Sequence, residues 1–163
     1  MEHLSKEISE NQRIVEERLR GCDDILLRPI MLGKDRETAC FLIYIETAVS
    51  NLMLEDSVIG RFLNELRELE QAKLYEALKK DALGISDTGK LFDTEAALAA
   101  MLAGNAVLFV DGLDFALKIG SKGYPGSGVQ KAESEKVLRG SREAFSESEK
   151  MNTALIRKRI RNT

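Results

Sequence analysis

Apolar residues in the first part of the chain follow two different periods, which predict a helix and then a β-hairpin. Between residues 4 and 19 the apolar positions recur at helical spacing, and Gly21 follows as a stop signal. The run Ile25–Leu32 is a strand candidate, and because Pro29 lacks an N–H we expect this strand at a sheet edge or with a bulge. The run Ala39–Ile45 has no polar alternation, which is typical of an interior strand covered on both faces. The short polar turn between the two runs predicts that they pair as an antiparallel hairpin.

The middle of the chain is predicted to be helical and to lead into a second hairpin. Residues 51–83 carry the apolar faces of one or two helices. Asp93 can cap a short helix that ends at Gly104, since its carboxylate can accept hydrogen bonds from the N–H groups of the first turn. The runs Ala106–Val110 and Phe115–Ile119 flank an Asp-Gly turn, which indicates a hairpin. Two hairpins with helices between them predict an α/β (α+β) fold built on a small mixed sheet.

A segment rich in glycine and proline separates this lobe from the last part of the chain. Between residues 121 and 131 it contains residues that forbid regular structure, namely Gly123, Pro125, Gly126 and Gly128. We interpret the segment as a solvated linker. A phosphate-binding loop is the alternative, but a Walker loop needs Gly-Lys-Ser/Thr after its glycines, and here Lys122 precedes them.

After the linker the sequence turns helical for about thirty residues, as far as Arg161. Steps of three and four place several positions on one face, where an ordinary amphipathic helix carries leucine and isoleucine. These positions are Leu138, Arg142, Phe145, Glu149, Asn152, Ile156 and Arg159. The polar groups among them need partners if this face is buried. We expect the apolar positions of the helix to pack back on the first lobe or to mediate self-association.

The same helix carries a motif that closely resembles the membrane-proximal part of the GerA spore germination family, the A subunits of bacterial germinant receptors. The match comprises Arg139, Gly140, Arg142, Glu143, Phe145, Glu147, Asn152 and Leu155–Ile160. Looser similarity covers residues 101–120 and 51–60. One departure is Ala144, where the family usually has glycine. Family members continue after this helix into further strands and a multi-helix membrane domain, whereas this chain stops at Thr163.

The resemblance implies a non-enzymatic, soluble N-terminal portion of a receptor A subunit, which takes part in the nutrient sensing and signal transduction that trigger germination. Residues 1–122 would be a first α/β lobe, residues 123–131 a hinge, and residues 132–163 the first helix of an incomplete second lobe. The implied partners are other receptor subunits and a small nutrient, an amino acid or a sugar. The parent protein would lie in the inner spore membrane, with this soluble portion on the cytosolic side. A pure subunit-assembly module with no ligand site of its own is the alternative.

Six polar residues of the last helix are candidate contacts for a partner subunit or an anion. They are Arg139, Arg142, Glu147, Asn152, Arg157 and Arg159. A structural ion-pair network is the competing interpretation, because Arg139 and Glu143 are four positions apart and can pair on one helix. The basic residues near the helix end have three interpretations: complementing the negative end of the helix, packing on the absent second lobe, or contacting a membrane or nucleic acid.

The charge and the cysteine and histidine content argue against several kinds of partner and site. The formal net charge of −3 gives no field that favours nucleic acid or anionic lipid. The two cysteines, Cys22 and Cys40, are interpreted as free small hydrophobes in a reducing compartment. Because His3 is the sole histidine, a Cys/His metal site and a Ser-His-Asp relay lack their parts. We therefore expect no metal, no cofactor and no enzymatic activity. The longest apolar runs are far shorter than the roughly 20 residues of a membrane-spanning helix.

Overall fold

A five-stranded sheet forms the centre of the computed structural model, which describes residues 3–46, 58–80, 88–120 and 148–160. The strand order is β1-β2-β4-β5-β3. The strands are β1 (Ile25–Leu32), β2 (Thr38–Ile45), β3 (Thr88–Leu91), β4 (Ala106–Val110) and β5 (Ala116–Ile119).

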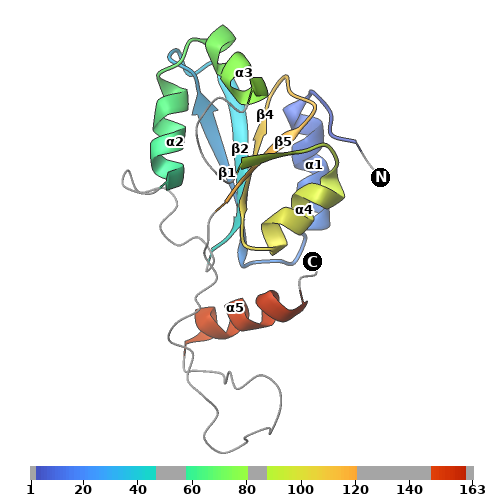
Figure 1. Ribbon diagram of the computed structural model, residues 1–163. Helices are drawn as coiled ribbons and strands as arrows, with labels where there is room; N and C mark the ends of the chain where they lie inside the picture. The colour runs from blue at the N-terminus through green and yellow to red at the C-terminus, as the bar shows by residue number, and fades with distance from the viewer. Residues whose placement is uncertain (1–2, 47–57, 81–87, 121–147, 161–163) are drawn as a thin grey trace, which may run out of the picture.

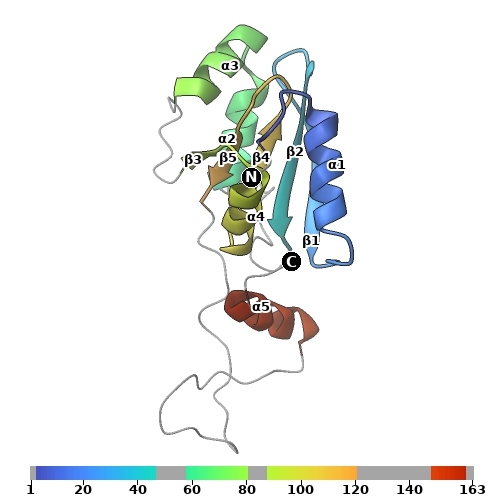
Figure 2. The ribbon, with the colours of Figure 1, turned by 90° about the vertical axis from the view of Figure 1, so that its right-hand side faces the viewer.

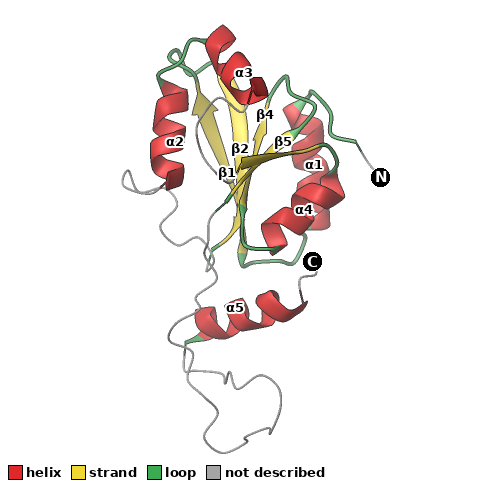
Figure 3. Cartoon of the chain, in the orientation of Figure 1, coloured by secondary structure: helices red, strands yellow, loops and turns green. Residues whose placement is uncertain are grey.

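Helices cover both faces of this sheet. They are α1 (Ile8–Arg18), α2 (Val58–Arg67), α3 (Gln71–Lys80), α4 (Thr94–Leu102) and α5 (Glu149–Ile160). Helices α1 and α4 lie together on one face, and α2 lies on the opposite face (Figure 1). In the view turned by 90° the first pair comes to the front of the sheet and α2 lies behind it (Figure 2). Helix α5 lies beyond one end of the strands, away from both helical layers (Figure 3).

The core lies between the two helical layers and is centred on β2 and β4. Every residue of β4 is buried, and all but one of β2. Phe41 and Phe109 face each other across this strand pair, with ring centroids 4.4 Å apart and an interplanar angle of 10°. The apolar run of β2 is therefore covered on both faces, as its lack of alternation predicts.

The predicted first hairpin and the predicted helix cap are confirmed. Strands β1 and β2 pair in an unbroken antiparallel register from Ile25↔Ile45 to Leu32↔Thr38. Strand β1 is the outermost strand, so Pro29, which has no N–H to donate, lies in an edge strand as predicted. Asp93 caps α4 by accepting a hydrogen bond from the Ala96 N–H at 2.8 Å.

The second hairpin is also confirmed. Its turn contacts both α1 and α3 within the sheet lobe, the name used below for the sheet together with helices α1 to α4. The Asp111 carboxylate accepts a hydrogen bond from the Ile8 N–H at 3.1 Å, so it caps the start of α1 from 103 positions away. The next amide, Gly112 N–H, donates to the Lys6 carbonyl at 2.8 Å. The Tyr75 hydroxyl donates to the Asp111 carbonyl at 2.9 Å. The turn therefore holds both α1 and α3 in place.

The predicted α+β fold is confirmed, but its sheet differs from the prediction in two respects. The mixed sheet is wrong for the described residues, because each of the four strand pairings is antiparallel. The long connection between β2 and β4 passes through helices and can return from either end of the sheet, so its length does not fix the strand direction. Strand β3 is missing from the prediction because it has four residues, including Gly89 and Lys90, which have low strand propensity. It forms by pairing with the open edge of β5.

The long C-terminal helix is not confirmed as a single element. Helix α5 has 12 residues and begins at Glu149. Residues 132–147, which were expected to belong to it, lie outside the described residues, as do the hinge candidates Gly123, Pro125, Gly126 and Gly128.

Candidate functional site at the C-terminal helix

An ion pair joins α5 to the sheet lobe. Arg157 Nε donates to Asp24 Oδ2 at 2.7 Å, and Arg157 Nη2 donates to Asp24 Oδ1 at 2.7 Å. The two side chains are only 15% and 16% exposed, respectively. This is a bidentate pairing, in which the planar guanidinium fork matches both carboxylate oxygens and fixes orientation as well as distance.

The local fold around Asp24 explains why its carboxylate is held in place. Helix α1 ends before Gly21, which has a φ of 84° that suits glycine. The chain then turns, with the Ile25 N–H donating to the Cys22 carbonyl at 3.1 Å. The Asp24 carbonyl accepts from the Glu46 N–H at 2.9 Å, which extends the β1–β2 hairpin by one more bond. Asp24 is therefore anchored at the open end of a regular hairpin.

The charges of the pair stabilise each other. The hydrogen bonds from Arg157 lower the pKa of Asp24 below its ordinary value of 3.8, against the opposing effect of burial. Hydrogen bonding to Asp24 raises the pKa of Arg157, with a smaller contribution from the Cys22 side chain and opposition from burial. Both groups are therefore ionised at neutral pH.

Acid is expected to remove the contribution of this pair. The folded-state pKa of Asp24 lies below 3.8, so the stabilisation is fully present above that value and is lost as the pH falls through the lower folded-state pKa. The measurement is the free energy of unfolding between pH 7 and pH 2 for the wild type and Asp24→Asn. The difference between the two should stay constant from neutral pH to about pH 5 and shrink below about pH 4. A difference that is the same at pH 2 and pH 7 would contradict this assignment.

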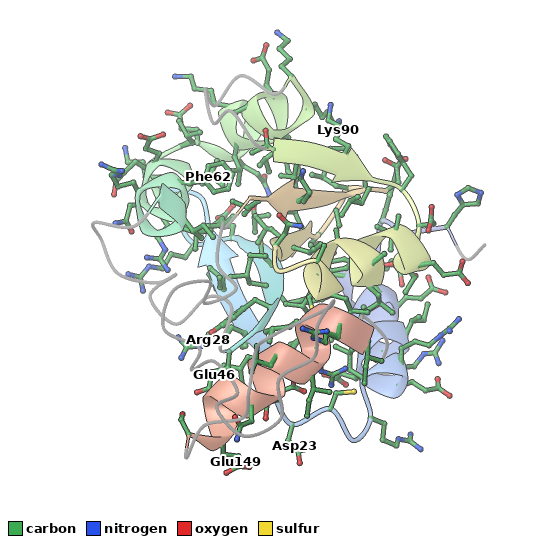
Figure 4. All side chains as sticks on the ribbon, turned by 60° about the horizontal axis from the view of Figure 1, so that its bottom comes forward. Asp23, Arg28, Glu46, Phe62, Lys90 and Glu149 are labelled. Carbon is green, nitrogen blue, oxygen red and sulfur yellow. The ribbon has the colours of Figure 1, made fainter. Side chains whose placement is uncertain are left out.

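The rest of α5 divides into a covered side and an exposed side. Leu155 is buried at 7% exposure, and Asn152 is half-buried. Ile156 and Ile160 are exposed, at 43% and 64%. Figure 4, which brings this end of the molecule forward, shows α5 in front of the end of the sheet lobe, with the labelled side chain of Glu149 pointing outward at one end of the helix.

The structure places the predicted contact residues as follows. Arg157 lies in the ion pair, Asn152 is half-buried, and Arg159 is exposed. The helical face expected to need buried partners is turned outward at Glu149, Ile156 and Arg159. The periodicity fixes which residues share a face, but it does not say which face meets the lobe. The candidates Arg139, Arg142 and Glu147 lie outside the described residues.

Asp24 is the functional candidate that the sequence does not reveal. It is one of 27 acidic residues and stands in a turn without a recognisable motif. Its importance depends on a partner 133 positions away. The one local signal is its position between a helix stop at Gly21 and the first residue of β1, where a side chain sits at an end of the sheet.

The described residues contain neither a metal-binding cluster nor a membrane-spanning helix. No group of three or more His, Cys, Asp or Glu side chains within them is placed to hold a metal ion. Burial raises the pKa of Cys40 to about 12, which leaves this thiol protonated and unreactive at neutral pH. None of the helices in the described part of the chain is both long and apolar enough to span a bilayer.

Comparison with known proteins connects this architecture to spore germination. The family model described as Bacillus/Clostridium GerA spore germination protein matches residues 13–163, which include the sheet lobe and α5. The chain is 32% identical over 158 residues to the uncharacterized membrane protein YfkQ of Bacillus subtilis (strain 168), covering 97% of this chain and 30% of that protein. It is 28% identical over 160 residues to spore germination protein KA of the same strain, covering 98% of this chain and 28% of that protein.

A solved structure has the same fold. The N-terminal domain of the A subunit of the Bacillus megaterium spore germinant receptor GerK3 superposes with a TM-score of 0.69 at 22% sequence identity. The alignment covers 98% of this chain and 57% of that domain. The chain thus spans less than a third of the length of these two curated relatives and more than half of the solved domain. With a family model that matches nearly its whole length, the chain belongs to the Bacillus/Clostridium GerA spore germination protein family.

Proposed function

We propose that this chain is the N-terminal part of a germinant receptor A subunit and takes part in the nutrient sensing and signal transduction that trigger spore germination. The observation that carries the proposal is the family match, which covers both the sheet lobe and α5. The ion pair between Asp24 and Arg157 adds a physical connection between these two parts. The fold shared with the N-terminal domain of a receptor A subunit is in accord with the same role.

The proposed mechanism is a shift of population between two arrangements of the sheet lobe and the segment that contains α5. A nutrient or a partner subunit that binds one arrangement better than the other favours it by its difference in affinity. No bond is made or broken in this mechanism, and the chain is proposed to be non-enzymatic. Its proposed partners are the other receptor subunits, with the parent protein in the inner spore membrane and this portion on the cytosolic side.

The exposed isoleucines of α5 favour a second candidate function, a pure subunit-assembly module. Ile156 and Ile160 are four positions apart and therefore share a face of the helix. At 43% and 64% exposure they present apolar surface that a neighbouring subunit can cover. On this alternative the chain binds protein partners and no small molecule.

Thermal unfolding of the 163-residue chain tests whether a complete nutrient site lies within this chain. A nutrient that binds only the folded state stabilises it by about 2.7 kcal/mol at a hundredfold excess over Kd. We expect no saturable shift with amino acids or sugars, because a one-sided surface cannot enclose a small ligand. Sensing would then depend on further parts of a longer protein. A saturable shift would assign a nutrient site to this chain and would rule out the pure assembly function.

A genetic experiment tests the shared claim that the protein acts in germination. Spores that lack the gene should respond more slowly, or not at all, to at least one nutrient in a panel of amino acids and sugars. A wild-type copy at another locus should restore the response. The readout is the fall in optical density as spores lose refractility. Unchanged germination with every nutrient, in a strain whose wild-type spores contain the protein, would contradict both candidate functions.

A further inference from the structure

Helix α5 lies at one end of the sheet, outside the two helical layers (Figure 3). Helix α4 packs along β2, β4 and β5, α1 packs along β2 and β4, and α2 packs along β1. Helix α5 meets the end of the lobe, where the pair between Arg157 and Asp24 lies near the buried Leu155. This pair is bidentate and largely buried, so breaking it by removing one partner should weaken the attachment of α5.

The two halves of this pair differ in how firmly they are held. Asp24 is fixed through its carbonyl, which accepts from Glu46, and through the regular β1–β2 hairpin that follows it. Arg157 is carried by α5, a helix of 12 residues. Isolated helices shorter than about 12–15 residues are marginal in water. Asp24 is therefore held rigidly by the lobe. Arg157, by contrast, is carried by a helix whose stability depends on its attachment to the lobe.

The direction of the exposed face of α5 depends on the same pair. Successive residues of an α-helix are rotated by about 100°, so Arg157 lies to one side of the face that contains Ile156 and Ile160. Two parallel hydrogen bonds fix the guanidinium plane against the Asp24 carboxylate. While they hold, the two isoleucines point away from the lobe, at 43% and 64% exposure.

We propose that the Asp24–Arg157 pair is a latch that controls both the docking and the helical order of α5. With the latch closed, α5 lies on the end of the sheet lobe and presents its isoleucine face outward. With the latch open, α5 leaves the lobe and frays, while the sheet stays folded. The device belongs to this chain itself and operates independently of any nutrient or partner subunit, so it stands or falls separately from the proposed function.

Hydrogen exchange on the 163-residue chain tests the latch. Arg157→Met keeps the aliphatic stem and removes the charge, and Asp24→Asn keeps the shape and removes the partner charge. Either change should lower the protection of the α5 amides roughly ten- to hundredfold, the range for a charge-assisted hydrogen bond, and leave β2 and β4 unchanged. The double variant should lose no more protection than either single variant, because both remove one interaction.

Arg13→Met provides the matched control. Arg13 forms an ion pair with Glu17 on α1, at 3.6 Å, but the two side chains are 67% and 65% exposed. Exposed pairs of this kind contribute little, so protection of α5 should not change. The latch is refuted if Arg157→Met leaves α5 as protected as in the wild type, or if α5, β2 and β4 lose protection together. Additive losses in the double variant would also refute it, because Asp24 and Arg157 would then act independently.

Discussion

Replacing Phe109 with alanine is expected to lower the free energy of unfolding by about 3–5 kcal/mol. Phe109 is the fourth of the five residues of β4 and is 1% exposed, and its ring stacks on Phe41 of the neighbouring strand. The substitution removes the buried ring and leaves a cavity on the face of the sheet beside Phe41, which the paired strands cannot close by moving together. Since domains of this size are stable by roughly 5–15 kcal/mol, the loss is a large fraction of the total. Chemical denaturation of the 163-residue chain measures it.

Phe92→Ala is the control for this experiment. Phe92 is 55% exposed and contacts Phe115 in a tilted arrangement, with ring centroids 6.1 Å apart. Its removal creates no interior cavity, so a cost of about 1 kcal/mol or less is expected. If both substitutions cost the same, the stacked pair between β2 and β4 is not the centre of the core.

Gly112→Ala is expected to destabilise the protein by about 2–3 kcal/mol, from two separate causes. Gly112 has a φ of 80°, a left-handed conformation that costs an alanine about 1–2 kcal/mol. An added Cβ would also lie 3.0 Å from the Tyr75 hydroxyl oxygen, which donates to the Asp111 carbonyl. Displacing that hydroxyl loses a hydrogen bond worth about 1 kcal/mol. Denaturation curves of the single variants give the total.

Gly21→Ala separates the two causes. Gly21 has nearly the same φ, 84°, but an added Cβ there meets nothing within 4 Å. It should therefore show only the backbone strain of about 1–2 kcal/mol. Equal losses at the two glycines would mean that the contact with Tyr75 contributes nothing to the stability of the turn.

The sequence predicts elements well where the signal is local. Pro29 marks an edge strand because its missing N–H is a property of one residue, and Asp93 caps a helix through an amide three positions away. Strand β3 escapes prediction because its four residues become a strand only beside β5. The direction of β2 relative to β4 is likewise a property of the assembled sheet.

At the candidate site, too, contacts between residues far apart in the sequence could not be predicted. The basic end of the last helix is visible in the sequence, and Arg157 does make a specific contact. Its partner Asp24 cannot be identified from the sequence. Nothing within ten residues of Asp24 indicates that a basic side chain from the other end of the chain will lie beside it. The covered face of α5 is not visible in the sequence either, since Ile156 is exposed although its spacing suits a buried position. The boundaries at residues 122 and 131 remain predictions.

The cap that Asp111 provides for α1 has a consequence for synthesis on the ribosome. The amide of Ile8 finds its acceptor 103 positions later, and the central strand β2 finds its second neighbour only when β4 exists. Contacts of such long sequence separation form late, because the connecting chain must first be closed at an entropic cost. We therefore expect the N-terminal helix and the first hairpin to keep apolar faces uncovered until β4 and Asp111 have left the exit tunnel. For this lobe the order of synthesis and the order of folding are therefore expected to differ, because α1 and the first hairpin are made before the residues that complete their contacts.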